Sequence, residues 1–122
     1  MIEQLVGQSI VEVMLNYSLT LITELRWFLV VESEFTVNTG AGPTVSMTPV
    51  PGEQPEWLSA LVGAVIESAS ISTDGGLELM LGSTRLTVDP DPDYEPWSVI
   101  GPGHQRIVAV PGGDQAVWSG DQ

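Results

Sequence analysis

The stretch Asp89–Trp97 holds the densest group of side chains that could bind or react. Its sequence, DPDPDYEPW, alternates acidic residues with prolines. Acids at every second position resemble the start of a calcium-binding loop, in which carboxylate oxygens surround the ion. Counting from Asp89, however, places Tyr94 where such a loop needs glycine and Ile100 where it needs glutamate. The sequence therefore predicts no metal site here.

The same stretch favours a recognition loop for a partner protein. Tyrosine and tryptophan offer a large contact area, and prolines reduce the ordering that binding requires. The candidate binding residues are Asp91, Asp93, Tyr94, Glu95 and Trp97. The alternative is a stiff, solvated loop whose prolines fix φ and block unwanted pairing at a sheet edge.

Few other residues suit catalysis. His104 is the only histidine, so a general-base role would fall to it or to a carboxylate. No serine lies in a Gly-x-Ser-x-Gly motif, and the chain lacks lysine and cysteine. Their absence excludes Schiff-base chemistry, thiol nucleophiles, disulfides, zinc–thiolate sites and iron–sulfur sites. We expect no catalytic residue, no cofactor and no enzyme activity, although a hydrolase whose paired carboxylates meet only in the fold stays open.

The charge of the chain narrows the classes of partner. The 122 residues include 16 acidic side chains against three arginines, which gives a formal net charge of −13. The phosphates of nucleic acids and anionic membrane surfaces would both repel such a protein. A basic protein would be attracted, because complementary charge speeds association and suppresses wrong partners.

No segment for secretion or membrane insertion is predicted. The N-terminus carries Glu3 where a secretory signal carries a basic residue. The longest apolar run, Leu19–Val31, is interrupted by Glu24 and Arg26 and falls short of the roughly 20 residues that a membrane span needs. We expect a cytoplasmic protein whose residues 1–122 form a single domain.

The two halves of the chain resemble each other. Leu5–Leu15 aligns with Leu61–Ile71, with Leu-Val-Gly identical, and Arg26–Val30 aligns with Arg85–Val88. Agreement in order and pattern predicts a duplicated supersecondary unit. The predicted repeat units cover about residues 5–37 and 61–118, with a loop or linker at 39–55 that is rich in Gly, Pro, Thr and Ser.

Alternation of apolar and polar residues predicts strands in the first unit. One apolar face is formed by Val11, Val13, Leu15 and Tyr17, and it is continued by Leu19 and Leu21. A further run holds Trp27, Leu29 and Val31, with Phe28 and Val30 between them. Because both faces of that run are apolar, we expect it to be buried on both sides.

Turn residues divide the second unit into further strands. The predicted strands are Val65–Ile71, Leu77–Leu81, Arg85–Val88, Ile107–Val110 and Ala116–Trp118. They are separated by the turn sequences Asp74–Gly76, Gly82–Thr84 and Pro111–Asp114. A short helix is predicted over Pro55–Gly63. With about eight strands and little helix, we expect an all-β protein in which two antiparallel meander units form a sandwich or a rolled barrel.

Tryptophans and arginines carry two further expectations. Trp27 and Trp118 lie inside strand-like runs and are predicted to be buried. Arg26 and Arg85 are placed at matching positions by the alignment, and we expect both to form internal ion pairs.

The second half resembles a family of small, mostly uncharacterised actinobacterial proteins, a domain of unknown function. The resemblance is carried by Asp91-Pro92-Asp93-Tyr94-Glu95 with Trp97, by Pro111-Gly112-Gly113 and by Val117-Trp118. It covers Leu61–Trp118 well and Leu5–Phe35 more loosely, and it implies no catalytic residue. In size and charge the chain is also similar to immunity proteins of bacterial toxin systems.

Three hypotheses about function follow. The first is a non-enzymatic module that binds a basic protein, such as a toxin domain that it neutralises in an immunity-like manner. The second is a small-ligand-binding protein or minor enzyme with a tryptophan-lined pocket between the repeat units. The third is a structural module that forms homo-oligomers through exposed strand edges.

Overall fold

Alternating apolar residues and glycine-rich turns divide the chain into short strands that form two antiparallel sheets. The computed structural model describes residues 1–120. The six-stranded sheet has the order β1 (Ile10–Leu15), β2 (Leu19–Thr23), β3 (Phe28–Val31), β9 (Trp97–Ile100), β10 (Gln105–Ala109) and β11 (Gln115–Ser119). The five-stranded sheet has the order β5 (Val45–Met47), β4 (Phe35–Asn38), β8 (Thr84–Val88), β7 (Leu77–Leu81) and β6 (Ile66–Ile71).

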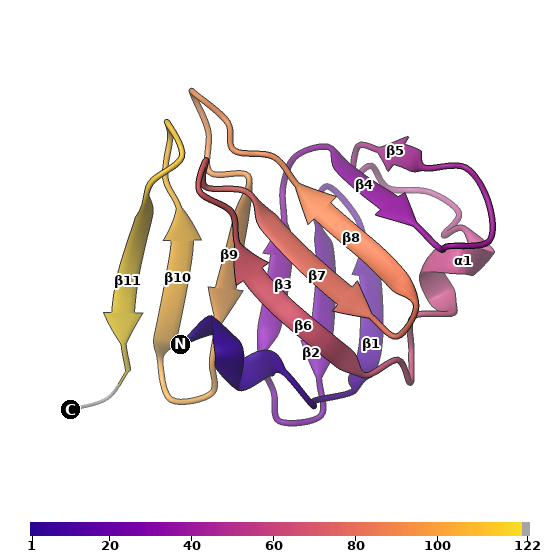
Figure 1. Ribbon diagram of the computed structural model, residues 1–122, viewed down its shortest axis with the longest axis horizontal. Helices are drawn as coiled ribbons and strands as arrows, with labels where there is room; N and C mark the ends of the chain where they lie inside the picture. The colour runs from indigo at the N-terminus through magenta and orange to yellow at the C-terminus, as the bar shows by residue number, and fades with distance from the viewer. Residues whose placement is uncertain (121–122) are drawn as a thin grey trace.

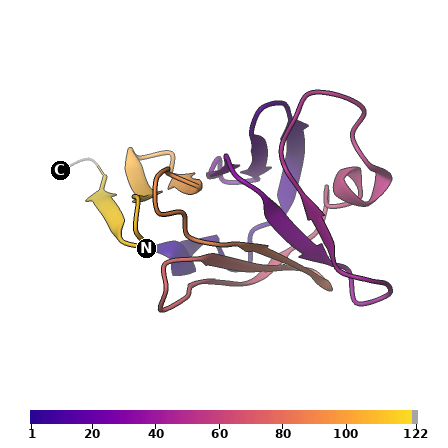
Figure 2. The same ribbon diagram turned by 90° about the horizontal axis from the view of Figure 1, so that it is seen from above.

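The two sheets pack face to face, as Figures 1 and 2 show, and neither closes into a barrel. The predicted all-β fold is therefore confirmed, and of the two architectures expected for it, sandwich or rolled barrel, the sandwich is the one that forms. Two helical elements complete the described residues, a 3-10 turn η1 (Ile2–Leu5) and α1 (Glu56–Ser59), the latter inside the predicted helix. Among residues 1–120 no helix is long and apolar enough to cross a membrane.

Residues 1–120 contain eleven strands, more than the sequence predicts. Leu19 and Leu21 do not continue the first strand, because the chain turns at Asn16–Ser18 and they form β2 instead. The predicted linker 39–55 includes β5, which pairs with β4. A strand of three residues is too short to show a periodic pattern, so it could not be recognised from alternation.

The connections exchange strands between the sheets. The chain passes from β3 into β4 in the opposite sheet, and from β8 back into β9 in the first. As a result, β9, which follows the meander β6–β8 in the chain, pairs with β3 and extends the meander β1–β3. In the same way, β4, which follows β1–β3, pairs with β8 and extends the meander β6–β8.

Reciprocal contacts relate the two segments that align in sequence. The amide of Gly7 donates to the Ile66 carbonyl at 2.8 Å, and the amide of Gly63 donates to the Ile10 carbonyl at 2.7 Å. Ser9 and Val65 form an antiparallel bridge between these contacts. Since Gly7 aligns with Gly63 and Ile10 with Ile66, the aligned segments face each other about an approximate two-fold axis.

Alternate residues of the facing strands fill the space between the sheets. The fully buried side chains include Leu21, Leu29, Phe35, Leu79, Leu86, Trp97 and Val99. The expectation that the Trp27–Val31 run is buried on both sides is wrong, because Phe28 points to the outer face and is 37% exposed. Val11 and Tyr17 are also exposed: β1 has a register shift between Ile10 and Glu12, and Tyr17 lies in the turn after it.

Trp27 is buried as predicted, whereas Trp118 is 52% exposed, so its predicted burial is wrong. The reason is the sheet order. Trp118 lies on β11, the last strand of the larger sheet, which Figure 1 shows beyond the edge of the five-stranded sheet.

The arginines do not occupy matching positions, which corrects a second expectation. Arg26 lies in the turn before β3 with φ at 68°, whereas Arg85 lies within β8. Arg85 pairs with Glu78 at 3.5 Å, but both side chains are substantially exposed. Among residues 1–120 Arg26 forms no ion pair, so the predicted internal pair is present for Arg85 and absent for Arg26.

Candidate functional site

The loop between β8 and β9 is held by hydrogen bonds to Asp91. Oδ1 of Asp91 accepts the amides of Asp93 at 2.8 Å and Tyr94 at 3.0 Å, which closes an Asx turn. The carbonyl of Asp91 accepts the Gly112 amide at 2.9 Å. The loop is therefore held both by its own side chain and by the turn between β10 and β11.

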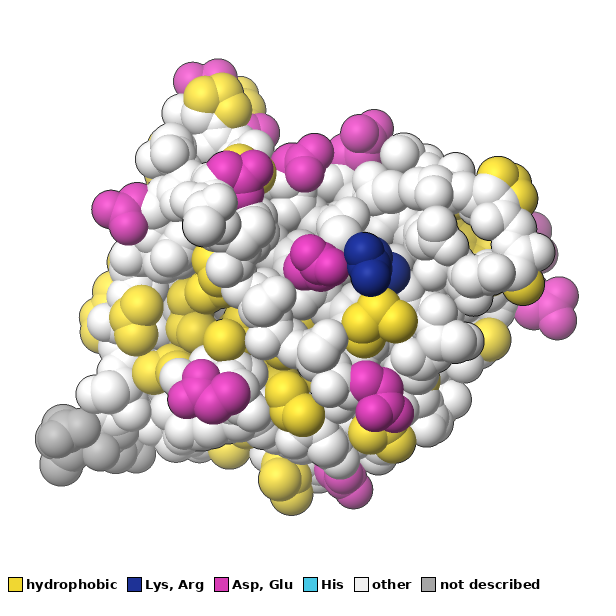
Figure 3. All heavy atoms as spheres, in the orientation of Figure 1, with side chains coloured by type: hydrophobic (Ala, Val, Ile, Leu, Met, Phe, Trp, Pro, Cys, Tyr) yellow, Lys and Arg dark blue, Asp and Glu magenta, His cyan; other side chains and the backbone are white. Residues whose placement is uncertain are grey.

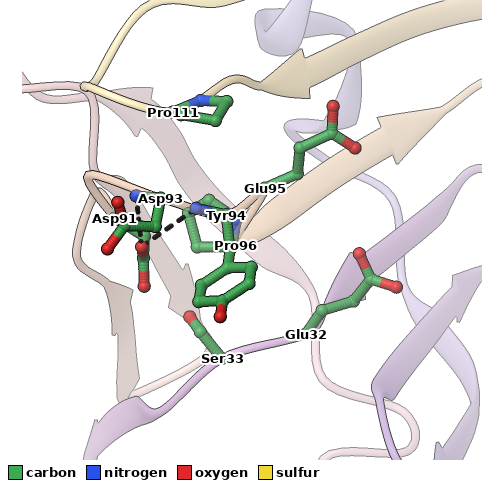
Figure 4. A pocket seen from close by; sticks show the side chains of 8 residues that line it. All are labelled: Glu32, Ser33, Asp91, Asp93, Tyr94, Glu95, Pro96 and Pro111. Carbon is green, nitrogen blue, oxygen red and sulfur yellow. Dashed lines mark hydrogen bonds between the residues drawn. The ribbon is translucent and has the colours of Figure 1, made fainter.

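This loop forms one wall of a groove of about 500 Å³, shown in Figure 4. The second wall is the connection between β3 and β4, whose Glu32 amide donates to the Pro96 carbonyl at 2.8 Å. The lining residues, which define the acidic groove, are Glu32, Ser33, Asp91, Asp93, Tyr94, Glu95, Pro96 and Pro111.

The charged lining of the acidic groove is entirely negative. It contains the carboxylates of Glu32, Asp91, Asp93 and Glu95 and no arginine. Tyr94 is 72% exposed and presents its ring between the two walls in Figure 4. Figure 3 shows further acidic side chains spread over the face of the five-stranded sheet. Within residues 1–120 no three histidine, cysteine or acidic residues converge in a geometry that could hold a metal ion.

Comparison with known proteins places the chain at the level of family. The pattern that defines a family of unknown function, DUF6188, matches residues 1–119. The chain belongs to this family. No curated protein and no solved structure matches it. The resemblance to a domain of unknown function is thus confirmed.

In this DUF6188 chain the sequence-predicted binding residues divide into two groups. Asp91, Asp93, Tyr94 and Glu95 all line the acidic groove. Trp97 does not, because its side chain is fully buried between the sheets and its indole Nε1–H donates to the Gly75 carbonyl at 3.2 Å. The prediction that Trp97 contacts a partner is therefore wrong. Its buried side chain instead fixes the end of the loop to the core between the sheets.

The sequence did not identify Glu32, Ser33, Pro96 and Pro111 as lining residues. Glu32 directly follows β3, and it reaches the groove because Val31 pairs with Trp97 across the β3–β9 ladder. The sequence signal for this wall is an acidic residue, Glu32, directly after the apolar strand β3. It does not show that Glu32 lies beside the β8–β9 loop, because that follows only from the pairing of β3 with β9. His104 lies at the opposite end of the β9–β10 hairpin, in the turn before β10 with φ at 67°.

A second carboxylate of the DUF6188 chain is set by local hydrogen bonds. The Ser72 hydroxyl donates to Oδ1 of Asp74, and the Gly76 amide donates to the same oxygen at 3.2 Å. Both donors stabilise the carboxylate and so lower the pKa of Asp74 below its ordinary value of 3.8. The Ser72 hydroxyl has the larger effect and the Gly76 amide the smaller one.

Replacing Ser72 by alanine should raise the pKa of Asp74 towards 3.8. Because the pKa of Asp74 is lower in the folded than in the unfolded protein, the ionised Asp74 carboxylate stabilises the fold above pH 3.8. This stabilisation is lost as the pH falls through the folded-state pKa of Asp74. A side-chain carboxyl NMR titration of both proteins checks this. Thr73→Ala is the matched control, and an Asp74 titration that Ser72→Ala leaves unchanged would refute the hydroxyl as the main cause.

Proposed function

We propose that this protein is a non-enzymatic binding protein whose acidic groove takes a basic segment of a partner protein. The observation that carries the proposal is a groove lined by four carboxylates from two separate connections, Glu32 on one side and the loop residues on the other, with no cation among its lining residues. Such a concentration of one charge attracts the opposite charge and orients the encounter.

The lining also suits the shape of an arginine side chain. Carboxylates accept paired hydrogen bonds from a guanidinium group. The exposed Tyr94 ring offers a face on which the same group can stack. The Asx turn at Asp91 and the hydrogen bond from Gly112 hold the loop before binding, which lowers the cost of ordering it.

The partner class that we propose is a basic toxin domain, neutralised by this protein inside the cell that produces it. The net charge of −13 and the length of 122 residues support an immunity-like role of this kind. A cytoplasmic location belongs to the same proposal, since the antagonist must meet the toxin before export.

The test compares two triple variants of equal net charge. Glu32→Gln, Asp93→Asn and Glu95→Gln neutralise the groove and leave Asp91 to hold the turn. Glu24→Gln, Glu53→Gln and Glu56→Gln remove the same charge from exposed residues outside the groove. The probe is a fluorescent synthetic peptide of alternating arginine and serine, followed by anisotropy at low and moderate salt.

The groove variant should bind the peptide about 10-fold more weakly than the wild type, since three partly exposed charge pairs contribute about 1.4 kcal/mol together. The control variant should lose much less, and wild-type affinity should fall as salt rises. Equal losses in the two variants would show that overall charge, and not the groove, attracts the peptide.

A further inference from the structure

The strand β11 ends the six-stranded sheet and is exposed on both of its faces. Val117 is 58% exposed on one face and Trp118 is 52% exposed on the other. No strand among residues 1–120 pairs with its outer side. Figure 3 shows hydrophobic side chains gathered over β10 and β11, with few acidic ones among them.

The phase of the hydrogen bonds shows which backbone groups face outward. The Val110 amide donates to the Asp114 carbonyl at 2.9 Å, so hydrogen-bonded pairs continue at Val108 with Ala116 and at Arg106 with Trp118. On the other side of β10, the Gly101 amide donates to the Gln105 carbonyl, which fits the same alternation. The amide and carbonyl of Val117 therefore point away from β10.

The other three sheet edges carry features that discourage pairing with another chain. β1 and β6 each have a register shift and an exposed glutamate, Glu12 or Glu67. β5 has only three residues and lies between two prolines. In contrast, β11 has five residues in regular register, with no charge and no proline. The nearest carboxylate, Asp114, precedes the strand and, within residues 1–120, accepts only the outward-facing amide of Gln115, at 2.9 Å. Natural sheets protect exposed edges with charges, prolines and bulges, so an edge without them is available for pairing.

We propose that β11 pairs antiparallel with β11 of a second copy of this chain, about a two-fold axis through Val117. In that register Val117 faces Val117 of the second copy and exchanges both hydrogen bonds with it. Ala116 faces Trp118, and Gln115 faces Ser119. The sequence of the strand is thus self-complementary, small against large and polar against polar, as a two-fold interface requires.

Charge favours a second copy as the occupant. Two chains of charge −13 repel each other, so they can associate only where acids are few. β11 is uncharged, and the only charged residue of the adjacent β10 is Arg106, 5.6 Å from the centre of the Trp118 ring. The nearest acid along the strand, Asp114, would face Gly120. A basic peptide would find no carboxylate on β11 to recognise it.

Dimerisation is tested by analytical ultracentrifugation from about 10 µM to about 1 mM, where small interfaces associate. The wild type should pass from monomer to dimer, and the dimer should strengthen as salt screens the repulsion. Val117→Pro removes the outward amide and no bond to β10, so it should fold and remain monomeric, while Val117→Thr keeps the amide and should dimerise. A monomeric wild type, or a dimer of equal affinity in Val117→Pro, would overturn the proposal.

Amide hydrogen exchange gives a second test, which uses the wild-type protein and does not depend on the Val117→Pro variant. The Val117 amide should exchange more slowly as concentration rises, whereas the Ala116 amide, bonded to β10, should be protected throughout. Exchange at Val117 that does not depend on concentration would also overturn the proposal. Salt separates this interface from the acidic groove, since it strengthens the dimer and weakens the binding of a basic peptide.

Discussion

Replacing Trp97 by alanine should lower the free energy of unfolding by about 3–5 kcal/mol, the range for losing a large buried aromatic side chain. Trp97 is fully buried and begins β9, in the interior of the six-stranded sheet. Its ring fills the core where the loop carrying the acidic groove joins the sheet, and its indole nitrogen satisfies the Gly75 carbonyl. The variant therefore loses packing and a buried hydrogen bond together.

Trp97→Phe separates these two contributions. Phenylalanine keeps much of the ring but leaves the Gly75 carbonyl without its donor, which should cost about 1–3 kcal/mol. Urea unfolding followed by far-ultraviolet circular dichroism at low micromolar concentration measures both variants. Tyr94→Ala is the control, since Tyr94 is 72% exposed and its loss should change stability by about 0.5 kcal/mol or less. If Trp97→Ala costs no more than Tyr94→Ala, the buried position of Trp97 is wrong.

The contrast between Trp97 and Trp118 shows what the sequence could not predict. Both tryptophans lie in apolar strand-like segments, and local alternation treats them alike. Their burial is decided by sheet order, since β9 lies between β3 and β10 whereas β11 has, within residues 1–120, a neighbouring strand on one side only. Sheet order follows from pairings between distant segments, which a local pattern does not encode.

Local features were predicted more completely. The turns at Asp74–Gly76 and Pro111–Asp114 were predicted from residue type, because glycine allows the positive φ that such turns need. The acidic wall of the groove was likewise visible in the stretch Asp89–Trp97. The opposite wall was not, because Glu32 and Ser33 reach it only through the pairing of β3 with β9. One half of the candidate site is thus local in sequence and the other half depends on the fold.

The acidic groove and the β11 edge divide the surface by charge. The groove gathers carboxylates on a loop that its own hydrogen bonds hold in place, whereas β11 presents an uncharged strand. A highly acidic protein can bind a basic partner and its own copy at the same time only if these surfaces are separate. The groove reaches the turn that joins β10 and β11 only at Pro111, and no residue of β11 is among its lining residues.

Gly75 and Gly113 bring the two glycine turns into direct backbone contact, and replacing either by alanine should be strongly destabilising. A Cβ on Gly75 would overlap the Gly113 carbonyl, and a Cβ on Gly113 would overlap the Asp74 carbonyl. Both glycines also have positive φ, at 97° and 93°. Backbone strain and the overlap together should cost about 2–4 kcal/mol in each variant.

Gly112→Ala measures the cost of the positive φ alone, without the backbone overlap that the other two variants add. Gly112 has φ at 92°, and a Cβ there would meet no atom within 4 Å. Its replacement should therefore cost only the left-handed conformation, about 1–2 kcal/mol. Urea unfolding of the three single variants and of the Gly75→Ala, Gly113→Ala pair measures the difference. Because both substitutions break one contact, the pair should lose less than the sum of its members. Additive losses, or a Gly75→Ala loss equal to that of Gly112→Ala, would show that the turns do not touch.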